Sequence, residues 1–105
     1  MGSGMIVGGM LCIQREMAEE FARMFEGFMK KFVKDFESRI RVGEKYVHLI
    51  FYRRVDSSVG GFAQAAVEQM IRGIRGVLEQ TGWSVTTRMQ DDVLYIVFSY
   101  PICGG

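Results

Sequence analysis

The stretch Met17–Ile40, MAEEFARMFEGFMKKFVKDFESRI, carries five of the eight phenylalanines of this 105-residue chain. They are spaced 4, 3, 4 and 4 residues apart, which is typical of an amphipathic helix with a bulky apolar face. On a helical wheel the apolar side chains of the stretch cover about 180°, whereas a surface helix needs an apolar stripe of little more than about 100°. The sequence therefore predicts that part of this face packs against something beyond an ordinary core.

The length of the predicted helix leads to the same expectation. We expect one helix from Met10 to about Arg41, followed by a stop at Gly43, which would be about 48 Å long. A domain of this size has a radius of gyration of about 13 Å, so the helix would overhang it unless it breaks at Gly27. Three interpretations stay open: the stripe enters the core, forms a symmetric homodimer, or lines a groove for a partner helix or an apolar ligand.

We favour the homodimer, because most soluble oligomers have twofold symmetry. Phenylalanine and methionine would suit the groove, since methionine adapts to varied shapes. The predicted interface residues are Met17, Phe21, Met24, Phe25, Phe28, Phe32 and Phe36.

Further elements are predicted on both sides of this helix. Met5–Val7 is expected to form a short strand that ends at Gly8-Gly9. Lys45–Val55 alternates loosely with apolar residues on both faces, which is typical of a central strand. A second helix is predicted from the N-capping segment Asp56–Ser58 to about Thr81, where Gly82 would end it.

The C-terminal part reads as a hairpin. The strands Trp83–Met89 and Val93–Tyr100 are joined by a tight turn at Gln90-Asp91-Asp92, and Cys103-Gly104-Gly105 is expected to be a frayed tail. The element order is (β)αβαββ, and we recognise no internal repeat. The predicted fold is α+β: a small, mostly antiparallel sheet of three or four strands with two helices on one face.

Composition places the chain among intracellular globular proteins. We interpret Met1–Gly4 as a cloning remnant and residues 5–105 as a single domain with a net charge of +1. Cys12 and Cys103 lack CxxC spacing, so we expect two free thiols in a reducing compartment. No apolar run is long enough to cross a membrane, and we expect a cytoplasmic location. The absence of asparagine is typical of thermophilic proteins.

The sequence offers little for catalysis or for metal binding. His48 is the only histidine, and a metal site needs a cluster of ligands. Asp91 and Asp92 lie at a hairpin tip, where acidic residues are favoured by turn geometry and are not enclosed. We therefore expect no enzymatic activity, no metal and no cofactor.

An anion site at the start of the second helix is a competing hypothesis. Helix N-termini offer free N–H groups, and neighbouring glycines and arginines would assist phosphate or nucleic-acid binding. The candidate residues are Arg53, Arg54, Ser57, Ser58, Gly60, Gly61, Arg72 and Arg75.

In element order the chain resembles the Alba-type archaeal nucleic-acid-binding proteins. The shared points are Met5–Gly9 before the first helix, the strand that ends in Arg53-Arg54, and the closing hairpin. The resemblance implies nucleic-acid binding. Our first expectation is nevertheless a small non-enzymatic interaction protein that self-associates through its first helix. An Alba-like module for nucleic acid or phosphate is the alternative, and a carrier of an apolar ligand is the third hypothesis.

Overall fold

Two long central strands organise the fold. In the computed structural model, which describes residues 4–7 and 10–104, β4 (Tyr46–Arg54) and β6 (Val93–Pro101) pair antiparallel along their whole length. β3 (Glu37–Val42) pairs with β4 and β5 (Ser84–Gln90) pairs with β6, which gives a four-stranded antiparallel sheet in the order β3-β4-β6-β5. Buried residues alternate with half-buried ones along β6, the period of a strand with one covered face.

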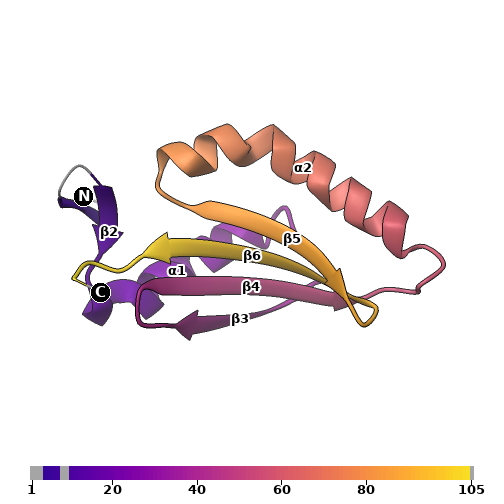
Figure 1. The fold of residues 1–105 in the computed structure, drawn as a ribbon, viewed down its shortest axis with the longest axis horizontal. Helices are drawn as coiled ribbons and strands as arrows, with labels where there is room; N and C mark the ends of the chain where they lie inside the picture. The colour runs from indigo at the N-terminus through magenta and orange to yellow at the C-terminus, as the bar shows by residue number, and fades with distance from the viewer. Residues whose placement is uncertain (1–3, 8–9, 105) are drawn as a thin grey trace.

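Both helices cover the same face of this sheet. α1 (Arg15–Met29) packs on β3 and β4, and α2 (Gly60–Gln80) runs along β5 (Figure 1). One buried cluster joins both helices to the sheet; it includes Ala18 and Ala22 of α1, Ile71 and Leu78 of α2, and Phe51 and Phe98 of the sheet. The predicted α+β class, with two helices on one face of an antiparallel sheet, is confirmed.

The first helix is shorter than the sequence predicted. α1 spans 15 residues, and β2 (Met10–Ile13) and β3 occupy the two ends of the stretch expected to be helical. The helix continues through Gly27 and ends at Met29, after which Asp35 takes a left-handed φ of 67°. Phe32 and Phe36 continue the spacing into the turn segment between α1 and β3, so the phenylalanine spacing did not mark the end of the helix. The expected 48 Å rod is therefore wrong.

The chain contains a structural repeat that the sequence analysis did not recognise. β4 begins at Tyr46 and β6 at Val93, 47 residues later, and β3 and β5 are separated by the same interval. Each strand pair follows one helix, so the order αββ occurs twice. Ile50 and Val97, themselves 47 residues apart, face each other across β4 and β6. An approximate twofold axis therefore passes through the sheet between these two residues.

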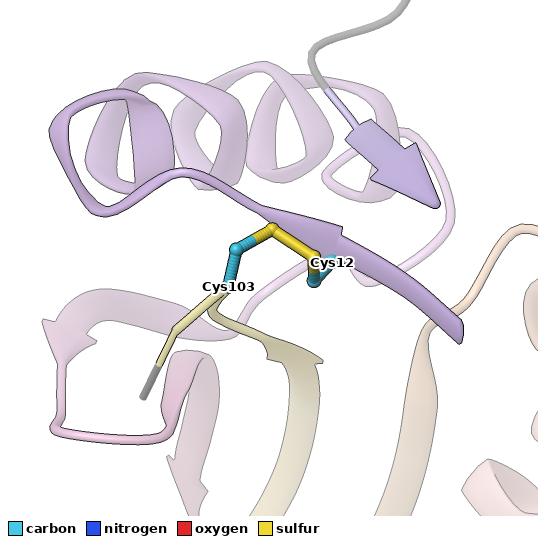
Figure 2. Close-up of a disulfide and its surroundings, with 2 residues drawn as sticks. All are labelled: Cys12 and Cys103. Atoms are coloured by element: carbon cyan, nitrogen blue, oxygen red, sulfur yellow. A yellow bond between two sulfur atoms is a disulfide. The ribbon is translucent and has the colours of Figure 1, made fainter. Parts of the chain in front are cut away.

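A disulfide joins the two ends of the chain. β1 (Gly4–Val7) pairs with β2 in a separate hairpin, and β2 lies at the end of the molecule where β6 ends (Figure 1). Cys12 of β2 is bonded to Cys103, with Cα atoms 5.0 Å apart (Figure 2). The backbone N–H of Cys103 also donates to the carbonyl of Ile13 at 2.8 Å. The predictions of two free thiols and of a frayed tail at Cys103 are therefore wrong, because a sequence alone does not reveal that distant strands end side by side.

Most local predictions are confirmed. β1 contains the expected strand Met5–Val7, whereas Gly8-Gly9, Gly105 and most of the presumed cloning remnant lie outside the described residues. Asp91 and Asp92 have φ angles of 53° and 62°, as a two-residue type I′ hairpin requires. Gly82, with φ 98°, follows the end of α2 as expected.

Candidate functional site

The single histidine and both cysteines are engaged in structural contacts. His48 Nδ1 lies 2.8 Å from Ser99 Oγ on the neighbouring strand, and burial, followed by the positive charge of Arg41, lowers the pKa of this histidine. Cys12 and Cys103 are consumed by the disulfide, so neither offers a thiolate. Among residues 4–7 and 10–104, no group of three or more His, Cys, Asp or Glu side chains is placed to hold a metal ion.

The predicted interface residues separate into two groups. Phe21, Phe25 and Phe36 are half-buried and pack against the core of this chain. The others keep large exposed fractions: Met17 42%, Met24 68%, Phe28 52% and Phe32 49%. We call these four residues the α1 patch. The structure thus assigns part of the stripe to the core and leaves part of it at the surface, on α1 and the turn that follows it. Large apolar side chains gathered at the surface mark an interaction site.

Aromatic contacts connect the α1 patch to the core. The Phe25 ring stacks on Trp83 with centroids 4.2 Å apart, and Trp83 is only 3% exposed. Phe28 lies 6.4 Å from Phe25 and 5.3 Å from Phe32, so the ring contacts continue outward to the surface. A patch anchored in this way is ordered before any partner binds, which reduces the entropy lost on association.

The spacing along α1 is that of a helix-pairing seam. Met17, Phe21, Met24 and Phe28 follow one another at intervals of 4, 3 and 4 residues, the a/d pattern by which two helices pack side by side. α1 lies against the sheet along another stripe, which includes Ala18, Ala22 and Met29. Phe21 of this seam is half-buried against the core, whereas Met17, Met24 and Phe28 keep large exposed fractions beside the sheet-facing stripe.

The predicted anion site is dispersed. The guanidinium of Arg53 lies over the Phe36 ring, 5.9 Å from its centroid, on the side of the sheet that carries the helices. Arg54 is the next residue on β4 and points to the opposite face. Arg72 is twelve residues beyond Gly60, or about 18 Å along α2. Arg75 contacts the Val85 carbonyl at 3.4 Å.

The start of α2 has a structural explanation for its polar and glycine residues. Asp56 accepts hydrogen bonds from the Ser58 N–H at 2.9 Å and the Ser58 hydroxyl at 2.8 Å, and these bonds lower the pKa of its carboxyl group. This exposed carboxylate adds a negative charge close to the start of α2. Gly60 is buried, and a Cβ there would lie 2.5 Å from Cε at the flexible end of the Met89 side chain, so this glycine packs closely against β5. Ser57 and Gly61 are exposed beside it.

A surface that the sequence analysis missed lies on the sheet face turned away from the helices. We call it the open face. Its rows follow from the strand register: Glu37–Tyr52–Tyr95–Arg88, Arg39–Ile50–Val97–Thr86, and Arg41–His48–Ser99–Ser84. Arginines on both outer strands thus flank tyrosines and aliphatic residues on the central strands. The alternation of charged residues along β3 was the available signal, but only the register places these residues together.

Comparison with family models, curated proteins and solved structures found no match for this chain. None of the helices in the described ranges is long and apolar enough to cross a membrane. Two surfaces of the molecule, the α1 patch and the open face, are the candidate binding sites.

Proposed function

We propose that this protein acts by binding rather than by catalysis and that it self-associates as a homodimer through the α1 patch. The observation that carries the proposal is the exposure of Met24 and Phe28, at 68% and 52%, on a stripe with helix-pairing spacing. Water contact with such side chains is unfavourable by about 25 cal/mol per Å² of apolar surface. A second copy would remove this surface from water.

Charge along α1 favours an antiparallel second copy as the occupant. Glu16 and Glu20 lie in the first half of the helix, and Lys30 and Lys31 follow its last residue. Antiparallel packing would bring the acidic start of one helix near the basic end of its partner. Because the same surface serves both copies, the contact closes as a twofold dimer and does not extend into a filament.

The double substitution Met24→Glu with Phe28→Glu tests the α1 patch. We expect the wild-type protein to have a dimer mass at high micromolar concentration and the variant to have a monomer mass, because two carboxylates cannot be desolvated at the seam. Light scattering after size-exclusion chromatography measures both masses, and circular dichroism checks that the variant is folded.

A matched control is Phe62→Glu, which changes another exposed phenylalanine, 80% accessible, on α2. This control should remain dimeric. A wild-type protein that stays monomeric at high micromolar concentration would contradict the dimer proposal. A monomer that co-purifies with an apolar ligand or with another protein's helix would instead favour one of the two groove hypotheses.

We also propose a cytoplasmic location in a thermophilic organism. A structural disulfide is rare in the cytosol of mesophiles but common in intracellular proteins of hyperthermophiles. The absence of asparagine in the chain agrees with this origin. The proposal thus retains the location expected from the sequence while accommodating the disulfide.

A further inference from the structure

The open face has an excess of positive charge. By strand alternation, Arg39, Arg41, Arg54 and Arg88 project on this side of the sheet, and Glu37 is the acidic residue that shares it within the described strands. Two such faces pressed together would repel each other, so this surface is unsuited to a second copy of the chain. Its charge is complementary to an anionic partner.

Aromatic side chains lie at the centre of this positive surface. Tyr52 and Tyr95 are direct cross-strand neighbours on β4 and β6. The guanidinium of Arg88 lies 5.9 Å from the centroid of the Tyr95 ring and donates to the side chain of Gln90. Flat rings on a rigid sheet, bordered by arginines, form the kind of platform on which unpaired bases stack.

A shallow hollow marks the middle of the face. It measures about 370 Å³ and is lined by Arg39, Ile50, Thr86, Arg88, Gln90, Tyr95 and Val97, without any carboxylate. Arg39 and Arg88 come from the two outer strands, which lie three strand spacings apart, or about 14 Å. Neither arginine forms a salt bridge within the part of the chain that the structure describes.

We propose that the open face binds single-stranded nucleic acid. A base stacks on Tyr95 within the hollow, and Arg39 and Arg88 contact phosphates on either side of it. A duplex fits poorly, because its bases are already stacked on one another and a broad sheet enters neither groove. The site is independent of the α1 patch, since the helices and the open face lie on opposite sides of the sheet.

Fluorescence anisotropy with labelled single-stranded oligonucleotides of DNA and RNA tests this site at low salt. We expect saturable binding that weakens as salt rises, and weaker binding to a duplex of the same length. The double substitution Arg39→Glu with Arg88→Glu should weaken binding by at least about tenfold. Tyr95→Ser should also weaken it, whereas Tyr95→Phe, which keeps the ring, should not.

Arg72→Glu is the matched control, because it reverses an exposed arginine on α2 without touching the open face. Binding that is lost equally in this control, or binding unchanged by the Arg39/Arg88 substitutions, would overturn the proposal. Absence of oligonucleotide binding at low salt, or a duplex bound as tightly as the single strand, would overturn it too. Light scattering on the same variants separates this result from self-association, since the open-face substitutions should leave the dimer mass unchanged.

Discussion

Replacing Phe98 by alanine should lower the free energy of unfolding by about 4 kcal/mol. The Phe98 side chain is completely buried near the centre of β6. Its ring meets Phe25 of α1 edge-on at 5.3 Å and Phe51 of β4 at 5.9 Å, so it fills the space between helix and sheet. Removing it leaves a cavity that two paired strands and a packed helix cannot readily close. Urea denaturation followed by circular dichroism measures the loss.

The control for this prediction is Phe62→Ala, which removes the same ring from a site that is 80% exposed on α2. Surface substitutions of this kind usually change stability by no more than about 0.5 kcal/mol. The difference between the two variants therefore isolates the contribution of the core position. Comparable losses at both positions would contradict the packing of Phe98 between α1 and the sheet.

The second half of the fold could be predicted from sequence because its signals are local. α2 is bounded by a turn-forming segment and by Gly82, and the β5–β6 hairpin is set by a two-residue turn. In the first half, the phenylalanine spacing continues across the end of a helix into a turn segment. Phe28, Phe32 and Phe36 continue the four-residue interval, but only Phe28 lies on the helix, and Phe36 directly precedes β3. Helix and strand propensities alone could not place the end of α1 or the start of β3.

The candidate sites were less predictable, because they depend on pairing between distant segments. The phenylalanine stripe divides into half-buried and exposed side chains, and this division depends on which side of α1 packs against the sheet. The open face unites Arg39 with Arg88, 49 positions apart, through two intermediate strands. No spacing rule within a single segment relates them. The residues of the predicted anion site are divided by a local effect instead, because β4 sends the adjacent Arg53 and Arg54 to opposite faces.

Replacing both Cys12 and Cys103 by serine should lower the free energy of unfolding by about 3 kcal/mol. The disulfide links residues 91 positions apart, so it restrains nearly the whole unfolded chain. Closing so long a loop removes much of the conformational entropy of the unfolded state, which raises its free energy relative to the folded state. Thermal unfolding should show the melting temperature falling by about 10 °C or more in the double variant.

Reducing agent separates this effect from any change in side-chain packing. Reduced wild-type protein should unfold like the double serine variant, and the variant itself should not respond to the reductant. We expect the loss of stability to begin in β2, the segment that the disulfide restrains. Without the disulfide, β2 is held to the C-terminal end by the bridge between Ile13 and Ile102 and by the hydrogen bond from the Cys103 N–H to the Ile13 carbonyl. Hydrogen exchange should therefore become faster in β2 while β4 and β6 stay protected. Unchanged stability on reduction would mean that the pairing of β2 with the C-terminal end already persists without the covalent link.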